Sequence, residues 1–438
     1  MISSRPENGV RPRATVGLLS WNGRHHLEHC LPALEAQLDP GMPWEVVVLD
    51  NASSDGTASW LRSRHPGVRV VESAENLGFC AGYNRLVRES DSEFFVLLND
   101  DTRPRVDWLR VLLGALEAAP ADVAAVGGLL VDWSGERLDF GRGILTFDGH
   151  ALQRGFGADL TRARSLVPRT GENILFPCGG NMATRRSSFL AAGGFDVDYF
   201  AYYEDVDLGW RLWAGGERVI SEPAAVAEHR SSGSSDRLGS FKRGFLFERN
   251  AFRTAFKNFD SVSFEAWMPS VLLTLLARTQ RLLIDNNPGG PLIAIDPYRQ
   301  PDPLATAGPA GKASLRHRVR RRLLRLLRGV PREDSSPGVR LSDPRTLAQL
   351  RAIQAVLGSL DGLTEARAAV QARRRRSDAE LFARFPLHLV PTYPGDVELF
   401  RSAGFRGLLP RTASWVEASL DQLAATDLLP WEMSASGS

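Results

Sequence analysis

Short apolar segments alternate with helix-like segments from residue 14 to about residue 127, and this alternation limits the possible folds more than any other feature. The apolar segments are 14–20, 45–50, 68–71, 94–98 and 123–128. They are rich in β-branched or aromatic residues and short enough to be strands. Because such strands are apolar on both faces and are separated by helices, they predict a parallel sheet with helices on both sides.

The segments between the expected strands include 24–38 and 105–119, and in the second of these the apolar residues recur at helical spacing. The expected buried face consists of Val106, Leu109, Leu113 and Leu116. The chain is thus predicted to begin with an α/β domain. Its length of 438 residues suggests two or three domains in all.

Composition excludes several classes of protein. The chain is 43% hydrophobic and 24% charged with a formal net charge of +2, which argues against a general nucleic-acid binder. The three cysteines, Cys30, Cys80 and Cys178, lack metal-ligand spacing and favour a reduced cytoplasm. Residues 1–13 are polar and basic, so we expect a disordered tail and not a signal peptide. No apolar run reaches the ~20 residues of a spanning helix.

Polar residues follow the second, third and fourth expected strands, in 50–57, 72–84 and 99–102. In open α/β sheets, ligands bind beyond the carboxyl ends of the strands. Each segment alone is also typical of a turn with a helix N-cap. The chain lacks a phosphate-binding glycine loop after its first strand, so it is not an ordinary dinucleotide dehydrogenase or P-loop enzyme.

Asp100 and Asp101 directly follow an expected buried strand, and two adjacent carboxylates there can hold a divalent cation. Such a cation is useful when the substrate carries a diphosphate that leaves during the reaction. Asp50, at another strand end, could accept hydrogen bonds from a base or ribose. Three further polar segments follow in the order 177–186, 193–212 and 227–230.

This order of motifs resembles the family 2 glycosyltransferases of the GT-A fold, a Rossmann-like nucleotide-diphospho-sugar transferase fold, and in particular their rhamnosyltransferase-like branch. The resemblance covers residues 14–258, which we expect to form the catalytic domain. It implies inverting transfer of a sugar from a nucleotide-diphosphate donor, with Mg²⁺ or Mn²⁺ on the diphosphate. Residues 259–438 are expected to form a mostly helical C-terminal extension, with a Pro/Gly-rich linker near 286–312.

The resemblance also implies a role for individual residues. Asp101 and His229 correspond to the metal ligands, and Asp205 to the catalytic base with Glu204 orienting it. The residues expected to bind the nucleotide sugar are Asp50, Asn51, Asn76, Gly78 and Asp100. Those expected to bind the acceptor are Gly179, Gly180 and Asn181, although this segment could equally be a plain turn before a helix.

Glu204, Asp205 and Asp207 lie among aromatic residues in the segment FAYYEDVDLGW. Burial of an unpaired carboxylate is costly, so these acids are either paired or catalytic. The alternative to a base is three acids that fill the first turn of a helix and interact favourably with its dipole. We expect a helix to begin near Asp205, and Asp207 to be structural.

The segment 241–259 places phenylalanines on one helical stripe and Arg249, Arg253 and Lys257 on another. This pattern predicts a docked amphipathic helix, whose basic stripe could instead face the donor phosphates. Segment 312–329 is a second basic amphipathic pattern, and either an anionic membrane surface or the catalytic domain could be its partner.

The expected enzyme is cytoplasmic or peripheral on the inner face of the membrane. It would act on a cell-envelope glycan or a lipid-linked precursor, with dTDP-rhamnose as one candidate donor by branch resemblance. A nucleotidyltransferase is the rival enzyme, but the segment after the first strand lacks the glycine-rich, basic loop of that class. A non-catalytic glycan-binding protein on a decayed transferase fold would be expected to have lost its acids.

Overall fold

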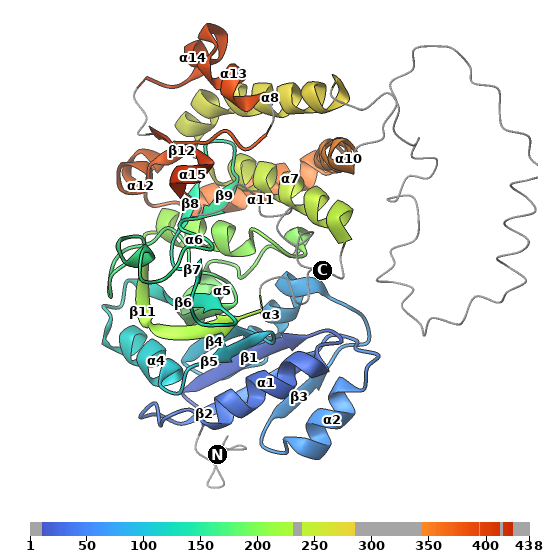
Figure 1. The fold of residues 1–438 in the computed structure, drawn as a ribbon, viewed down its shortest axis with the longest axis vertical. Coiled ribbons are helices and arrows are strands. Elements are labelled where there is room, and N and C mark those ends of the chain that lie inside the picture. The colour runs from blue at the N-terminus through green and yellow to red at the C-terminus, as the bar shows by residue number, and fades with distance from the viewer. Residues whose placement is uncertain (1–10, 231–238, 285–343, 394, 412–414, 424–438) are drawn as a thin grey trace, which may run out of the picture.

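The computed structural model describes residues 11–230, 239–284, 344–393, 395–411 and 415–423. Figure 1 shows the sheet and its helices in the lower half and the C-terminal helices above them. Part of the expected tail, the expected linker near 286–312 and the basic segment 312–329 lie outside the described residues.

One large mixed sheet forms the centre of the first domain. Its strands are β1 (Ala14–Ser20), β2 (Trp44–Asp50), β3 (Arg69–Glu72), β4 (Phe94–Asn99), β5 (Thr102–Pro104), β6 (Val123–Asp132), β7 (Leu138–Phe140), β10 (Asn181–Arg185) and β11 (Arg218–His229). They are ordered β3-β2-β1-β4-β10-β6-β11-β5, and β7 pairs with β6. The register places Ser20 opposite Asp50 and Leu19 opposite Asn99, so the carboxyl ends of β1, β2 and β4 meet at one edge.

The sheet is not wholly parallel, which corrects the expectation from the sequence. β10 runs antiparallel to both β4 and β6, and β11 runs antiparallel to β5. All five expected strands are present, and the pairs β1–β2, β2–β3 and β1–β4 are parallel. β10 arises from the segment expected to line the acceptor site or to form a plain turn before a helix. Its residues, NMATR, mix polar and apolar side chains and lack the apolar run that marked the expected strands.

Helices cover the sheet on both sides. They are α1 (Arg24–Glu35), α2 (Thr57–Arg64), α3 (Gly78–Arg88), α4 (Trp108–Ala118), α5 (Arg186–Ala191) and α6 (Glu204–Ala214). The predicted helix over 105–119 begins later than expected, at Trp108. Val106 therefore lies outside it and is 52% exposed, whereas Leu109, Leu113 and Leu116 are buried as predicted.

Shorter elements connect the sheet to the rest of the chain. The hairpin of β8 (Gly143–Leu145) and β9 (Ala151–Gln153) reaches up toward the C-terminal region (Figure 1), where Ile144 and Leu152 pack with Val390 and Leu423. Two 3₁₀ turns, η1 (Ala163–Ser165) and η2 (Val197–Tyr199), lie in the loops, and η2 comes shortly before α6.

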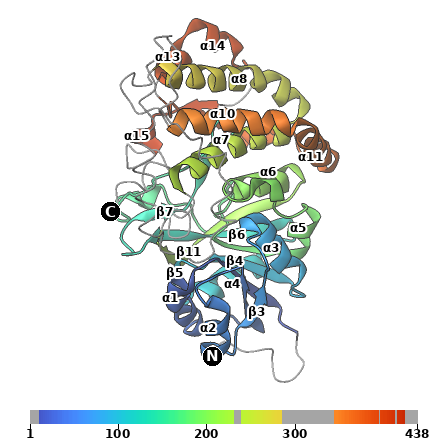
Figure 2. The ribbon, with the colours of Figure 1, turned by 90° about the vertical axis from the view of Figure 1, so that its right-hand side faces the viewer.

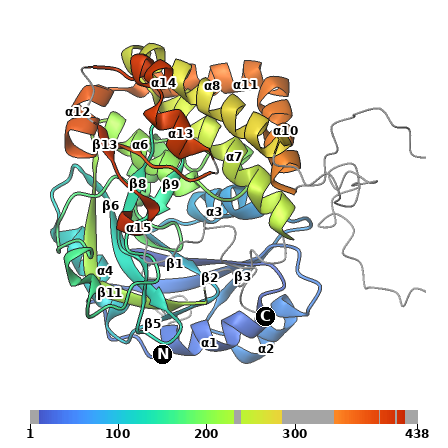
Figure 3. The ribbon, with the colours of Figure 1, turned by 45° about the horizontal axis from the view of Figure 1, so that its top comes forward.

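The C-terminal extension is mostly helical, as predicted. Its helices are α8 (Ser261–Ile284), α10 (Pro344–Gly358), α11 (Leu360–Arg373), α12 (Asp378–Arg384), α13 (Asp396–Arg401), α14 (Ala403–Leu408) and α15 (Leu420–Leu423). A small parallel pair, β12 (Leu387–Leu389) and β13 (Trp415–Glu417), was not expected. Helix α7 (Gly239–Asn258) contacts α6, α10 and α11, and Figures 2 and 3 show it between the sheet domain and the upper helices.

Buried charges join the extension to the first domain. The guanidinium of Arg278 on α8 lies 2.7 Å from Asp148 in the β8–β9 turn and 2.9 Å from Asp396. His150, from the same turn, lies 3.3 Å from Glu248 on α7. Burial opposes the imidazolium, but Asp148 and Glu248 raise the pKa of His150 to about 9. Within the described residues, no helix is both long and apolar enough to cross a membrane.

Candidate active site

Asp50 ends β2 at the edge where several strands finish, and its carboxylate shapes the loop that follows. Oδ1 accepts a hydrogen bond from the backbone N–H of Ser53 at 2.9 Å, and Oδ2 accepts one from Ala58 at 3.1 Å. The side chain is thus fixed in place at the strand end. Each oxygen keeps a second lone-pair direction that a ligand can use.

Asn51 connects this loop to the one before α3. Its amide nitrogen donates to Oδ1 of Asn76 at 2.9 Å, and its oxygen accepts from the backbone of Leu77 at 2.9 Å. Asn76 in turn accepts from the backbone N–H of Gly78. Gly78 has φ of +73°, and a Cβ there would lie 2.5 Å from the ring of Phe200. The structure therefore brings Asn51, Asn76 and Gly78 together, beside the loop that leads to α6.

Asp100 and Asp101 follow β4 and are both buried, but they point to different neighbours. Oδ2 of Asp100 lies at the start of α1, where a Cβ on Gly23 would be 2.1 Å away from it. Oδ1 of Asp101 lies 3.3 Å from Nε2 of His229. The carboxylate and the imidazole expected as metal ligands are therefore neighbours.

The second ring nitrogen of His229 has a carboxylate partner that the sequence did not reveal. Nδ1 of His229 lies 2.6 Å from Oδ2 of Asp139 on β7. Although burial disfavours the imidazolium, Asp101 and Asp139 raise the pKa of His229 well above its usual value of 6.5. Burial also opposes ionisation of Asp101, yet His229 lowers the pKa of that carboxyl.

These residues fit a hard divalent cation. Oδ1 of Asp101 is buried and faces Nε2 of His229 at 3.3 Å, so a carboxylate oxygen and an imidazole nitrogen lie side by side. Histidines that bind metals usually donate their second ring nitrogen to a carboxylate, as the contact with Asp139 allows. Across the described part of the chain, no group of three or more His, Cys, Asp or Glu side chains forms a complete cation site. Mg²⁺ commonly uses one or two protein carboxylates and takes its other ligands from substrate phosphates and water.

The predicted helix around Asp205 is α6, which begins at Glu204. Asp205 is partly exposed at its first turn, and Oδ2 accepts a hydrogen bond from the backbone N–H of Gly179 at 3.0 Å. Oδ1 accepts from the backbone N–H of Val206 at 2.8 Å. Gly179 is thus brought to the candidate base.

Glu204 is buried, and Oε2 of its carboxyl has no hydrogen-bond partner among the described residues. Burial raises its pKa well above the usual 4.5, and the charge of Asp205 adds to this effect. Burial also raises the pKa of Asp205, but the two backbone N–H groups oppose that shift. The two environments separate the acids, so Glu204 is the one that keeps its proton more firmly.

Asp207 is fully buried, on the far side of this turn. It lies 2.7 Å from Arg211 and 2.8 Å from Lys257, and Asn258 donates to it at 2.8 Å. Burial alone would raise the pKa of Asp207, but the two cations hold it well below its usual range. These contacts give Asp207 the structural role expected for it.

Asn181 points away from the loop that it follows. It is wholly buried in β10, where its oxygen accepts from the indole of Trp108 at 2.8 Å and its amide donates to the carbonyl of Leu129 at 3.1 Å. Both ends of the amide are used inside the sheet, so we omit Asn181 from the proposed acceptor site. Gly180 lies against Asn99, and a Cβ there would be 2.5 Å from the amide nitrogen of Asn99.

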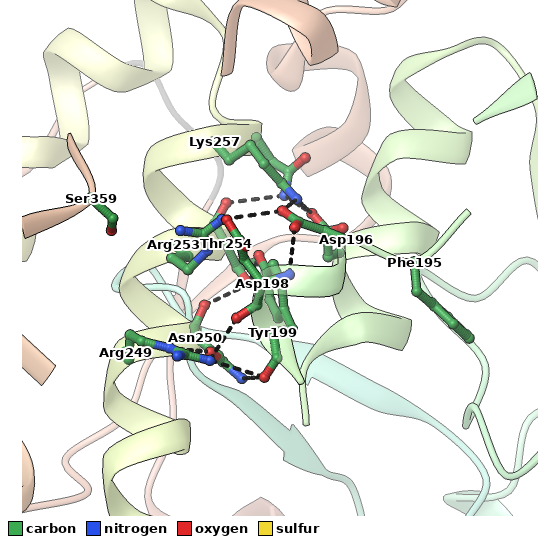
Figure 4. A network of polar contacts seen from close by, with 12 residues as sticks. Phe195, Asp196, Asp198, Tyr199, Arg249, Asn250, Arg253, Thr254, Lys257 and Ser359 are labelled. Atoms are coloured by element: carbon green, nitrogen blue, oxygen red, sulfur yellow. Dashed lines mark hydrogen bonds and ion pairs between the residues drawn. The ribbon is translucent and has the colours of Figure 1, made fainter. Parts of the chain in front are cut away.

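The basic stripe of α7 pairs with carboxylates of the protein itself, as expected for a docked helix. Figure 4 shows that it faces the loop before α6. Arg253 lies 2.8 Å from Asp198, and Lys257 lies 2.6 Å from Asp196, with both basic side chains 3% exposed. Helix α7 is a docked helix, and its cations neutralise carboxylates of that loop.

Comparison with known proteins identifies the first domain. Residues 15–191 match the family model described as Glycosyl transferase family 2. They are a family 2 glycosyltransferase domain. The matched residues of this domain include Asp50, Asp101 and Gly179, but end before Glu204 and His229. The chain has a helix-covered α/β sheet followed by a mostly helical extension, as the sequence predicts.

Two proteins similar to this chain are rhamnosyltransferases. N-acetylglucosaminyl-diphospho-decaprenol L-rhamnosyltransferase of Mycobacterium tuberculosis is 29% identical over 231 residues, which are 48% of this chain and 74% of that protein. Rhamnosyltransferase WbbL of Escherichia coli is 35% identical over 95 residues, which are 20% of this chain and 35% of that protein. Among solved structures, GalNAc-T7 with UDP, GalNAc and Mn²⁺ has a TM-score of 0.45 at 15% identity, over 61% of this chain and 52% of that one.

The family match favours a glycosyltransferase over the nucleotidyltransferase and the non-catalytic glycan binder considered above. The acids that a decayed transferase would be expected to lose are all present. Sequence reasoning missed Asp139, which lies in an inconspicuous short segment, and it did not indicate what the polar face of α7 contacts.

Proposed function

We propose that this family 2 glycosyltransferase transfers a sugar from a nucleotide-diphosphate donor to an acceptor hydroxyl with inversion at the anomeric carbon, and that Asp205 is the general base. One observation carries the proposal. Of the three acids in the first turn of α6, Asp205 alone is partly exposed, while Glu204 and Asp207 are buried. A base must reach the proton that it removes, and Asp205 meets that requirement.

In the proposed reaction the acceptor oxygen attacks the anomeric carbon from the face opposite the diphosphate. Its proton passes to the carboxylate of Asp205, while the bond from the anomeric carbon to the diphosphate oxygen breaks and its electron pair leaves with the diphosphate. The backbone N–H of Gly179, at 3.0 Å from Oδ2, holds the carboxylate in one orientation. Glu204 supports this role by keeping its proton, because a second negative charge beside Asp205 would be unfavourable.

The donor is proposed to lie along the carboxyl ends of β2, β3 and β4. Asp50, Asn51, Asn76 and Gly78 would bind the nucleoside side, since their contacts join the two loops at that edge. Asp100 would lie on the ribose or metal side, at the start of α1. Gly179 and Gly180 remain the proposed acceptor-side residues, because neither carries a side chain that would block a sugar.

Asp101 and His229 would hold Mg²⁺ or Mn²⁺, and Asp139 would orient His229. When bound, such a cation neutralises negative charge on the departing diphosphate. The names of the two related rhamnosyltransferases suggest rhamnose as the sugar, and that of the mycobacterial relative suggests a lipid-linked acceptor. We also propose that segment 312–329, which lies outside the described residues, binds the cytoplasmic face of a membrane.

The proposal is tested by product stereochemistry. The full chain is incubated with a panel of nucleotide sugars that includes dTDP-rhamnose, with polyprenyl-diphosphate-linked acceptors and with Mg²⁺ or Mn²⁺. The anomeric configuration of each glycoside product is then read by NMR. We expect a configuration opposite to that of the donor, and retention would contradict the proposed mechanism.

A further inference from the structure

The loop between η2 and α6 contains an unusual run of left-handed backbone. Phe200, Tyr202 and Tyr203 have φ of 63°, 68° and 69°, although none of them is glycine. The N–H of Ala201 donates to the carbonyl of Tyr199 at 2.7 Å, which closes a γ-turn of the rare positive-φ kind around Phe200. Positive φ is strained for a residue that carries a side chain, so the surrounding structure must hold the loop in place.

Asn250 on α7 supplies much of that restraint. Its amide nitrogen lies 3.1 Å from the carbonyl oxygen of Tyr199, 2.9 Å from that of Ala201 and 2.8 Å from that of Tyr202. Asn250 is completely buried. Figure 4 shows its side chain directed at the loop beside Tyr199. One side chain thus binds three carbonyls of the strained segment, immediately before the helix that carries Asp205.

The neighbouring arginine on α7 binds backbone carbonyls of the same loop. Arg249 donates to the carbonyl of Asp198 at 2.7 Å and to that of Tyr199 at 3.0 Å. Its Nε donates to Oδ1 of Asn250 at 2.9 Å, which fixes the amide with its nitrogen toward the loop. The orientation of Asn250 is therefore itself set by a hydrogen bond.

The opposite side of the loop contacts the start of α3, which belongs to the proposed donor site. The carbonyl of Phe200 accepts from the N–H groups of Phe79 and Cys80, at 2.8 and 3.2 Å, at the start of α3. The ring of Phe200 lies against Gly78. The strained loop is consequently held between α3 on the donor side and Asn250 on α7.

We propose that Asn250 is a positioning residue for the transfer reaction, a role that rests on the proposed function of Asp205. By holding the carbonyls of Tyr199, Ala201 and Tyr202, Asn250 sets the direction in which α6 starts. That direction places the Asp205 carboxylate on the N–H of Gly179. Asn250 reaches the reacting atoms only through the loop, so its loss should slow turnover while donor binding is retained.

The test compares Asn250→Leu with Thr254→Val in the full chain. Leucine keeps the size of asparagine but removes both N–H donors. Thr254 lies one turn along the same helix, and its hydroxyl bonds to the side chain of Tyr199 and to an α7 carbonyl, but to no carbonyl of 199–202. It is therefore a matched control for general loosening of α7.

Turnover is measured at saturating donor, and nucleoside-diphosphate binding is measured by calorimetry with Mn²⁺. We expect Asn250→Leu to lower kcat at least tenfold with the Kd within threefold of wild type, and Thr254→Val to keep kcat within twofold. If Asn250→Leu keeps kcat within threefold, or if both variants lose kcat equally, the positioning role is wrong. An equal loss of kcat and affinity would also overturn it.

If the leucine variant does not fold, Asn250→Ser, which keeps one hydrogen-bond donor, replaces it in the same test. We expect its kcat to fall at least fivefold. A serine variant with wild-type kcat would contradict the inference. Asp205→Asn in the same assay separates this inference from the proposed function. If Asp205→Asn stays active, the proposed function fails; if it is inactive while the Asn250 variants turn over normally, only the positioning role fails.

Discussion

Nδ1 of His229 lies 2.6 Å from Oδ2 of Asp139, and this contact fixes the imidazole so that Nε2 faces Asp101. Both ring nitrogens face carboxylates, but the Nδ1 contact is the shorter, so a neutral His229 is expected to keep its proton on Nδ1. Nε2 is then the nitrogen able to bind a cation. The two residues come from β7 and β11, far apart in the sequence.

Asp139→Ala should weaken Mn²⁺-dependent nucleoside-diphosphate binding by about 10–100-fold, the usual cost of losing a carboxylate that orients a metal-binding histidine. Calorimetry with and without Mn²⁺ measures the effect. Glu228→Gln is the matched control, because Glu228 is adjacent to His229 but pairs with Arg103. Unchanged Mn²⁺-dependent affinity in Asp139→Ala would remove Asp139 from the metal site.

Asp101→Ala should have a larger effect than Asp139→Ala, since it removes an oxygen proposed to bind the cation directly. His229→Ala should act in the same direction but less severely. The same calorimetric titration ranks the three variants. Mn²⁺-dependent binding that survives intact in Asp101→Ala would show that the cation is held elsewhere.

Glu204→Gln should change how stability depends on pH. The pKa of Glu204 is raised in the folded chain, so above about pH 4.5, the usual value, the unfolded chain loses this proton while the folded chain keeps it. Raising the pH therefore favours unfolding of the wild type. Glutamine does not titrate, so the variant lacks this pH-dependent loss of stability. Denaturant unfolding at pH 5 and pH 8 should show the variant gaining stability relative to wild type at the higher pH. An equal difference at both pH values would contradict the raised pKa.

Arg278→Met should destabilise the chain by about 3–5 kcal/mol, because it leaves the buried carboxylates of Asp148 and Asp396 without their cation. Chemical denaturation measures this loss. Arg406→Met is the control, since its pair with Glu417 is exposed and should contribute less than about 1 kcal/mol. Comparable losses in the two variants would mean that the Arg278 cluster does not hold the extension in place.

Much of the sheet was predictable because its strands carry local signals. The expected strands at 14–20 and 94–98 coincide with β1 and β4 to within a residue, since continuous apolar runs between helices permit few other structures. β10 was not predictable in the same way. Its antiparallel pairing with β4 and β6 is a long-range contact, and the segment NMATR has no apolar run to mark it as a strand.

The candidate site was partly predictable because its acids fall at strand and helix ends. The expected metal ligands, Asp101 and His229, prove to be neighbours, and α6 begins at Glu204. Asp139 lies 90 residues from His229 and Asn250 lies 51 residues from Tyr199. No periodicity or spacing connects residues at such separations, so only the folded structure could reveal these contacts.

The most direct test of the account is Asp205→Asn, which keeps the size of the side chain and removes the base. Turnover with the accepted donor and acceptor is measured beside calorimetric affinity for the nucleoside diphosphate with Mn²⁺. We predict loss of turnover by more than about 10³-fold, within the usual range of general-base contributions, with affinity within threefold of wild type. Turnover within tenfold of wild type would show that Asp205 is not the base.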